Sequence, residues 1–130
     1  MDRLFLDANI LFSAAYRPDG RTNELWSLAG VRLTTSEYAV TEARRNLSEQ
    51  DQRERLDALV GAIEVVSTIL APLPQGIDLP AKDWPILQAA IGCGATHLIT
   101  GDHRHFGALF GQVIAGVRVT TVREYLSTRR

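Results

Sequence analysis

At residues 4–14 the sequence reads LFLDANILFSA, and this stretch indicates the class of fold. The apolar run that begins after Arg3 is typical of a short buried strand. From Asn9 to Tyr16 the apolar side chains recur at helical spacing, so a helix is predicted directly after the strand. Asp7 therefore lies where the first strand ends and the first helix begins.

The alternation of strand and helix continues along the chain. Further strands are predicted at residues 31–35, 64–66, 97–100 and 117–121, and further helices at 22–29, 36–47, from 48, from 83, at 105–110 and from 122. Residues 71–80, rich in proline and glycine, are predicted to form a loop. Strands separated by helices imply right-handed crossovers and a sheet covered on both faces. We therefore expect a three-layer α/β/α sandwich with a central parallel sheet, in one domain over residues 1–130.

The composition is that of an ordinary globular protein, with 45% hydrophobic and 22% charged residues. No run approaches the roughly 20 apolar residues that span a bilayer, and no signal peptide is visible, so we expect a cytoplasmic protein without membrane association. The net charge of −1 gives no general attraction to nucleic acid. However, 13 of the 14 basic residues are arginine and five of these lie from Arg104 onward, which allows a local basic surface for RNA.

Acidic residues fall where open parallel sheets bind ligands, just beyond the carboxyl ends of strands. Asp7 ends the first strand, Asp102 follows the strand predicted at 97–100, and Asp83 opens the helix that leads into that strand. This fold is expected to bring the three together. Asp7 and Asp83 also have a structural interpretation, because Asp is a preferred N-cap that satisfies free backbone N–H groups at a helix start.

Glu42 lies inside the third predicted helix, among the apolar side chains of Ala39 and Ala43. An acid at this place suggests a functional role. A salt bridge to Arg45, three residues further on, is the structural alternative, and the spacing alone favours neither interpretation.

Four carboxylates in one place need a counter-ion. Two carboxylates about 5 Å apart repel by about 3 kcal/mol at an effective dielectric constant near 20, and a divalent cation removes this penalty. Oxygen ligands without cysteine or a required histidine favour Mg²⁺ or Mn²⁺ over zinc. Such a site polarises a phosphoryl oxygen and activates water for attack on a phosphodiester.

Three strings carry a resemblance to the PIN-domain family: LFLDANILFSA, VTEARRNL at residues 40–47, and KDWPILQAAIGCGATHLITGDHRHF at residues 82–106. The most specific part is an acid that opens an alanine-rich helix, followed by a strand and Thr-Gly-Asp. The resemblance implies a three-layer α/β fold and a nuclease that cuts RNA with Mg²⁺ or Mn²⁺. Many bacterial PIN proteins are toxins held inactive by a small antitoxin, so the resemblance also implies an antitoxin partner.

The resemblance assigns the catalytic and metal-binding role to four acids: Asp7, Glu42, Asp83 and Asp102. Asn9 matches the small polar position after the first acid and Thr100 the hydroxyl before the last, and both would orient carboxylates or water. The sequence departs from the pattern at His105, where many relatives carry another acid. The number of metal ions is therefore left open.

Two other enzyme classes place acids at strand ends, and both are disfavoured. Haloacid-dehalogenase-like phosphatases need a second Asp two residues after the first, where this chain has Asn9. Receiver domains need a lysine at a strand end, but the sole lysine, Lys82, precedes a helix. The alternative from another class is a catalytically silent PIN-like module that binds RNA or protein. The presence of all four acids favours the nuclease.

Other side chains are also candidates for binding. Trp84 and Phe106 adjoin the proposed site and are candidates for stacking on bases, and His103 or His105 for contact with phosphate. PIN relatives commonly form dimers, and the early apolar segment with Trp26 is a candidate surface for a homodimer.

Overall fold

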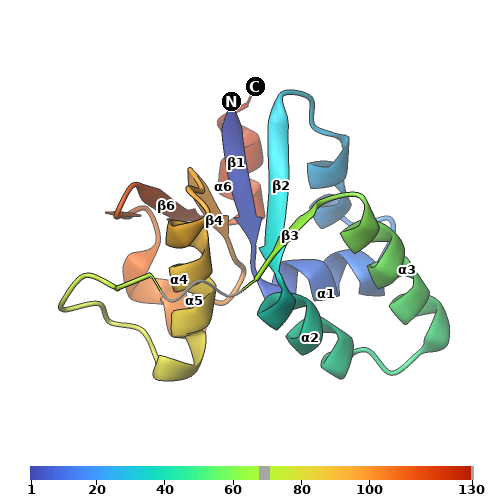
Figure 1. The fold of residues 1–130 in the computed structure, drawn as a ribbon. Helices are drawn as coiled ribbons and strands as arrows, with labels where there is room; N and C mark the ends of the chain where they lie inside the picture. The colour runs from blue at the N-terminus through green and yellow to red at the C-terminus, as the bar shows by residue number, and fades with distance from the viewer. Residues whose placement is uncertain (68–70, 130) are drawn as a thin grey trace.

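The computed structural model describes residues 1–67 and 71–129, and within them the chain forms a six-stranded sheet with helices on both faces (Figure 1). The strands are β1 (Asp2–Leu6), β2 (Val31–Ser36), β3 (Glu64–Val66), β4 (His97–Ile99), β5 (Val113–Ile114) and β6 (Val117–Thr120). The α-helices are α1 (Ala8–Tyr16), α2 (Glu37–Asn46), α3 (Gln50–Gly61), α4 (Trp84–Gly92), α5 (His103–Phe106) and α6 (Val122–Ser127). Three 3₁₀ helices complete the described part: η1 (Arg21–Ser27), η2 (Ala81–Asp83) and η3 (Gly107–Leu109).

The sheet has the strand order β3-β2-β1-β4-β6-β5, so β1 and β4 lie side by side at its centre. Both pair in parallel with their neighbours, and the register sets Leu6 opposite Ile99. The chain leaves β1 toward β2 on one side and returns to β4 on the other. The carboxyl ends of β1 and β4 therefore form the point where strand order reverses, which is the usual ligand site of open α/β sheets.

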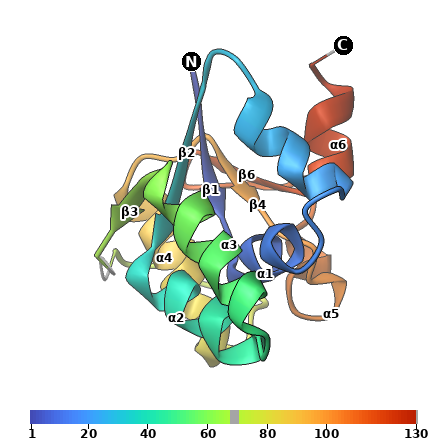
Figure 2. The ribbon, with the colours of Figure 1, turned by 90° about the vertical axis from the view of Figure 1, so that its right-hand side faces the viewer.

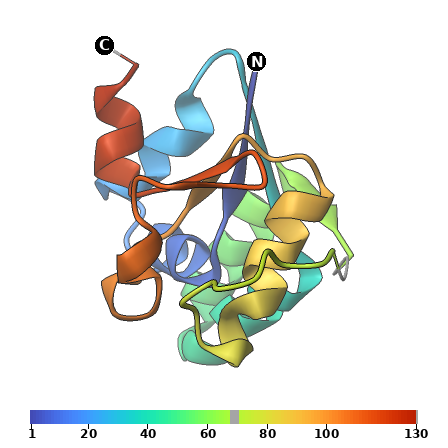
Figure 3. The same ribbon diagram turned by 90° about the vertical axis from the view of Figure 1, so that its left-hand side faces the viewer.

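The helices form an outer layer on each side of the sheet. Helices α1 and α3 lie over one face (Figure 2), and α4 lies over the opposite face (Figure 3). Leu4, Phe5 and Leu6 of β1 and Leu98 and Ile99 of β4 are all fully buried. Central parallel strands are covered on both faces, which explains why these runs are apolar throughout and do not alternate with polar residues.

The three-layer α/β sandwich predicted from the sequence is confirmed, and each strand predicted from the sequence is present within one or two residues of its expected bounds. Residues 71–80 contain neither helix nor strand, as predicted. The sheet is parallel except at one edge, where β5 pairs antiparallel with β6. This two-residue strand was not predicted. It depends on a tight turn in which Ala115 and Gly116 both adopt positive φ, of 49° and 88°.

Two helix predictions were wrong in detail. Where an α-helix is expected at 22–29, the chain forms the 3₁₀ helix η1 over Arg21–Ser27, and the N-cap residue of η1, Gly20, has no side chain to cap it. The helix expected at 105–110 begins earlier, as α5, and passes into η3. In the described ranges the longest helix, α3, has 12 residues, and no helix there is long and apolar enough to cross a membrane.

Candidate active site

A pocket of about 510 Å³ lies at the carboxyl ends of β1 and β4. Its wall includes all four predicted acids together with two of the other residues singled out in the sequence: Asp7, Glu42, Asp83, Asp102, Asn9 and His105. The acids come from the end of β1, from α2, from the start of α4 and from the end of β4. The fold therefore brings together side chains from four segments of the chain, as predicted.

Asp7 is the most buried of these acids, with 5% of its surface exposed. Its Oδ1 accepts a hydrogen bond from the backbone N–H of Ala8 (2.6 Å), so the N-cap interpretation is correct for this residue. Its Oδ2 accepts hydrogen bonds from the Thr100 hydroxyl (2.8 Å) and the Asn9 amide (2.9 Å). Asp7 thus caps α1 and faces the pocket at the same time.

Burial raises the pKa of Asp7 from 3.8 to about 6, because a carboxylate surrounded by protein loses its solvation by water. The hydrogen bonds from Thr100, Ala8 and Asn9 act in the opposite direction, and the negative charge of Asp83 adds to the rise. A cation close to Asp7 would favour its ionised form.

Asn9 and Thr100 connect the ends of β1 and β4. The Asn9 amide donates to the Thr100 hydroxyl (3.1 Å), and its Oδ1 accepts from the backbone N–H of Gly101 (2.8 Å). The Thr100 oxygen also accepts from the backbone N–H of Asp102 (3.2 Å). Both residues lie where the sequence predicts supporting residues, and they fix the orientation of Asp7.

We expect Thr100→Val to lower the free energy of unfolding by about 1–3 kcal/mol, because valine keeps the shape but leaves buried hydrogen-bonding groups without a partner. Thr100 is fully buried, so water cannot replace the hydroxyl. Urea unfolding in EDTA measures the change. Thr100→Ser, which keeps the hydroxyl, is the control and should lose less than about 1 kcal/mol. Equal stability of Thr100→Val and wild type would contradict the network.

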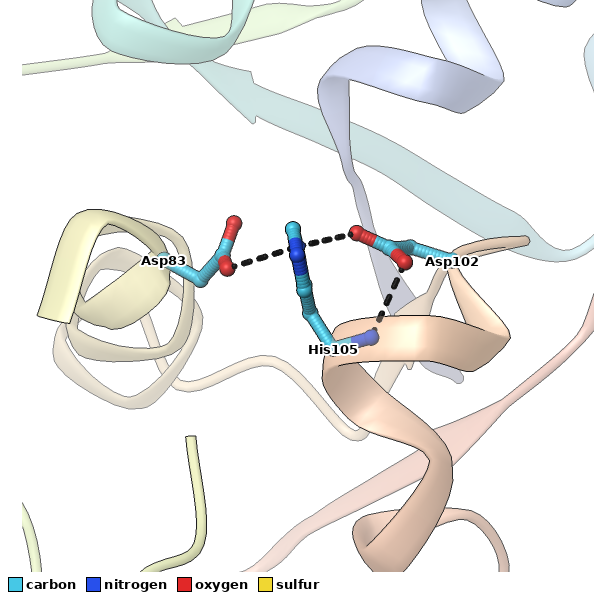
Figure 4. A group of neighbouring side chains, drawn as sticks. All are labelled: Asp83, Asp102 and His105. Carbon is cyan, nitrogen blue, oxygen red and sulfur yellow. Dashed lines mark hydrogen bonds and ion pairs between the residues drawn. The ribbon is translucent and has the colours of Figure 1, made fainter. Parts of the chain in front are cut away.

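Asp83, Asp102 and His105 form a close group on the pocket wall (Figure 4). The His105 Nδ1 lies 3.1 Å from Asp83 Oδ2 and 2.9 Å from Asp102 Oδ2. Figure 4 shows the imidazole between the two carboxylates, which come from opposite sides of the pocket. Asp102 Oδ1 accepts from the backbone N–H of His105 (3.0 Å) and so caps α5.

Asp83 occupies the N-cap position of α4, as predicted, but the capping role expected of its side chain is wrong. Its carboxylate makes no capping hydrogen bond to α4 within the described structure. Burial raises the pKa of Asp83, the positive charges of His105 and Lys82 lower it, and the negative charge of Asp102 raises it again. The carboxylate of Asp83 therefore remains available for a ligand in the pocket.

Two atoms of this group are buried without a hydrogen-bond partner in the part of the chain that the structure describes: Asp83 Oδ2 and His105 Nδ1. Buried polar atoms are nearly always hydrogen-bonded, and an exception needs an explanation. The ligand atoms of Asp83, Asp102 and His105 lie within 4.8 Å of one another. The donor set fits a divalent cation, although it contains an imidazole nitrogen where the sequence predicted oxygen ligands alone.

Glu42 lies at the edge of the same pocket but outside this close group. Its Oε1 forms an ion pair with Nη1 of Arg45 (2.6 Å), as the structural alternative predicted. About a third of its side chain, 35%, is exposed. Glu42 can still contact a ligand in the pocket, because lining the pocket and pairing with Arg45 are compatible.

Tyr38 and Lys82 also line the pocket and were not proposed as site residues from the sequence. The Tyr38 hydroxyl donates to the backbone carbonyl of Lys82 (2.8 Å), which joins α2 to the segment before α4. Burial, and then the charges of Glu42 and Asp83, raise the pKa of Tyr38. A signal was present in the sequence, because Tyr38 precedes Glu42 by four residues and so shares its helix face.

Several other candidates are excluded from the pocket. Phe106 is fully buried in the core, so it cannot stack on a base. Trp84 lines a separate pocket together with residues 73–77 and donates its indole N–H to the carbonyl of Leu79 (2.8 Å). His103 packs against Phe110, with 4.9 Å between ring centroids.

The surface suggested for a homodimer is largely internal. Leu25 of η1 is fully buried. Trp26 packs against the core and donates its indole N–H to the carbonyl of Leu59 (3.1 Å). Leu25 therefore cannot contact a second copy, and packing within the chain accounts for the buried part of Trp26.

No family model and no curated protein matches this sequence. Solved structures do share its fold. A chain of VapBC2 from Rickettsia felis, bound to a DNA fragment from its promoter, has 17% identity and a TM-score of 0.66, covering 92% of this chain and 98% of that one. A chain of DNA-bound VapBC from Salmonella typhimurium has 19% identity and a TM-score of 0.63, covering 94% and 99%.

A chain of FitAB bound to an IR36 DNA fragment is similar to the same extent, with 21% identity, a TM-score of 0.60 and coverage of 92% and 94%. The likeness extends over nearly the whole length of each chain. At these identities it shows a common fold, and the PIN-like α/β fold expected from the sequence is confirmed.

Proposed function

We propose that this protein is a PIN-domain endoribonuclease that hydrolyses RNA phosphodiester bonds with a divalent metal ion, Mg²⁺ or Mn²⁺. The observation that carries the proposal is the pocket at the switch point of the sheet, in which Asp83 Oδ2 is buried beside other acids without a hydrogen-bond partner in the described structure. The His105 Nδ1 lies 3.1 Å from this oxygen without hydrogen-bond geometry, and clustered buried carboxylates cost free energy that a divalent cation would remove. The fold shared with the VapBC and FitAB chains supports the same function.

Asp83 and Asp102 would hold the metal, with Asp7 and Glu42 as the remaining acids of the set. A divalent cation supplies Lewis acidity, which polarises a phosphoryl oxygen and lowers the pKa of water. The rest of the chemistry belongs to the chain. Thr100 and Asn9 fix the orientation of Asp7, and Lys82 places a positive charge on the pocket wall where an RNA phosphate can enter.

The acids also explain why a metal is needed for substrate binding. Four carboxylates at one pocket repel a phosphodiester, and Lys82 alone does not balance them. Arg45, on the same helix as Glu42, is already paired with that carboxylate. The RNA backbone is therefore expected to bind only when a cation has neutralised the pocket.

A protein partner is part of the proposal. The similar chains belong to VapBC2, VapBC and FitAB, each solved bound to a DNA fragment. By analogy we propose that this chain, as a single domain over residues 1–130, is the toxin of a toxin–antitoxin pair and binds a small antitoxin. The antitoxin would block access of RNA to the pocket until the antitoxin is removed.

The test is cleavage of a mixed RNA substrate by the purified protein with Mg²⁺ or Mn²⁺ against EDTA. We expect cutting that needs metal and that falls by at least about a hundredfold in Asp102→Asn, the size of effect seen when one group that stabilises charge in a transition state is removed. Asp51→Asn, at an exposed acid that pairs with Arg55 and does not line the pocket, is the matched control and should cut like wild type. Absence of cutting, without any rise in melting temperature on adding metal, would favour a silent binding module.

A further inference from the structure

We propose that His105 is itself a metal ligand, so that the site binds first-row transition-metal ions such as Co²⁺ and Mn²⁺ in preference to Mg²⁺. The inference rests on the proposed function only in placing a divalent cation at this pocket. It replaces the set of oxygen ligands expected from the sequence with two carboxylates and one imidazole: Asp83, Asp102 and His105.

The spacing of the three side chains supports this arrangement. Two neighbouring ligands in an octahedral shell with bonds of about 2.1 Å lie about 3.0 Å apart. The observed distances from His105 Nδ1 are 3.1 Å to Asp83 Oδ2 and 2.9 Å to Asp102 Oδ2. Both distances from Nδ1 therefore match the separation of adjacent ligands of one ion, and the ligand atoms of all three side chains lie within 4.8 Å of one another.

Hydrogen bonding does not explain these short distances. Neither contact of Nδ1 has the geometry of a hydrogen bond, and both Nδ1 and Asp83 Oδ2 are buried and unpartnered among the described residues. In the neutral imidazole with its proton on Nε2, the lone pair of Nδ1 is free for a third atom. A cation between the three would satisfy the nitrogen and both oxygens at once.

The surrounding structure holds the histidine in place. The backbone N–H of His105 donates to Asp102 Oδ1, which leaves Oδ2 of the same carboxylate to face the imidazole. The side chains are largely buried, with 17% of Asp83, 26% of Asp102 and 23% of His105 exposed. Asp102 and His105 lie on one short turn, and Asp83 comes from the other side of the pocket.

The nitrogen donor decides the choice of metal. Mg²⁺ prefers oxygen ligands, whereas imidazole suits transition-metal ions, whose affinity for such sites rises from Mn²⁺ to Co²⁺ and Ni²⁺. An acid at position 105 would make the set entirely oxygen and would suit Mg²⁺. The difference between Co²⁺ and Mg²⁺ affinity therefore reports directly on the residue at 105.

A competing interpretation makes the opposite prediction. A positively charged imidazole could stand between the two carboxylates in place of a metal and oppose its binding. Removing the imidazole would then strengthen metal binding, whereas removing a ligand weakens it. The direction in which metal affinity changes when the imidazole is removed therefore distinguishes the two interpretations of His105.

The experiment is calorimetric titration of the metal-free full chain with Co²⁺, Mn²⁺ and Mg²⁺, for wild type, His105→Gln, His105→Asp and the control His103→Gln. We expect His105→Gln to bind Co²⁺ about 10–100 times more weakly. His105→Asp should recover Mg²⁺ binding and lower the ratio of Co²⁺ to Mg²⁺ affinity by at least about tenfold. His103→Gln, altered on the same helix at a side chain that packs against Phe110, should resemble wild type.

Pulsed electron paramagnetic resonance of the Mn²⁺ complex gives a readout independent of affinity and of activity. Coupling to an imidazole nitrogen should be present in wild type and His103→Gln and absent in His105→Asp, and circular dichroism checks that each variant is folded. Nitrogen coupling that persists in His105→Asp, or unchanged or tighter Co²⁺ binding by His105→Gln, would overturn the inference.

The two proposals can fail separately. Metal-dependent RNA cleavage with no nitrogen coupling would support the nuclease function and reject His105 as a ligand. Nitrogen coupling without RNA cleavage would support the ligand and reject the nuclease. Absence of any metal binding would reject both.

Discussion

Asp83→Asn is expected to lower metal-dependent RNA cleavage by at least about a hundredfold, or about 2.7 kcal/mol in kcat/KM, while the protein remains folded. Asp83 offers a buried oxygen that has no hydrogen-bond partner among the described residues, and it makes no capping bond to α4 there. The substitution therefore removes a metal ligand and the ion pair with His105, but no capping bond and no hydrogen bond of the described structure. It also relieves repulsion from Asp102, which raises the pKa of Asp83.

The measurement pairs cleavage rates in Mn²⁺ with urea unfolding in EDTA. The free energy of unfolding of the metal-free variant should stay within about 1 kcal/mol of wild type, as expected for loss of a partly exposed ion pair. The metal-induced rise in melting temperature should be lost with the activity. A variant that cuts like wild type would show that Asp83 is not a metal ligand. A variant that fails to fold would show that Asp83 has a structural role instead.

Asp7→Asn is expected to abolish cleavage and yet to stabilise the metal-free protein at pH 7. A rise in pKa from 3.8 to about 6 corresponds to about 3 kcal/mol of unfavourable free energy for holding this buried carboxylate ionised. Asparagine carries no charge and can still accept from the backbone N–H of Ala8. Its amide nitrogen cannot accept from Asn9 and Thr100 as Oδ2 of the carboxylate does, and the loss of these two bonds costs about 2 kcal/mol, so we expect a net gain of about 1 kcal/mol.

The difference in stability between wild type and Asp7→Asn should depend on pH. Because the pKa of Asp7 is raised in the folded protein, its contribution is most favourable below pH 3.8, where the group is protonated in both states. That contribution is lost as the pH rises through about 6. Urea unfolding in EDTA at several pH values should show wild type losing stability over this range relative to Asp7→Asn. A variant less stable than wild type at pH 7 would mean that capping of α1 outweighs the cost of the buried charge.

The central part of the fold could be predicted because burial dictates composition there. β1 and β4 are covered on both faces and therefore appear in the sequence as continuous apolar runs. An acid follows each of these runs, and the two acids could be predicted to lie close together because the carboxyl ends of parallel strands meet at one edge of the sheet. Asn9 and Thr100 were found from the resemblance alone, since nothing in their spacing distinguishes them from ordinary polar residues.

The parts that could not be predicted depend on contacts between distant segments. β5 has only two residues, and it pairs because a turn with two positive φ angles folds it back onto β6. Asp83 had two equivalent interpretations in the sequence, and only the direction of its carboxylate separates them. His105 was noted as a departure from an acidic pattern, but its place between Asp83 and Asp102 requires the packing of α5 opposite α4.

The position of β4 has a consequence for the order in which the molecule can be made. β4 lies beside β1 at the centre of the sheet, although the hydrogen-bonded Asp7 and Thr100 are 93 residues apart in the chain. A nascent chain that has emerged from the ribosome as far as the end of α3 contains Asp7 and Glu42 but neither Asp83 nor Asp102. Domains fold as units during synthesis, and pairing between distant strands is slow. The pocket is therefore among the last features to form, and a chain that attacks RNA would be inert while it is still being translated.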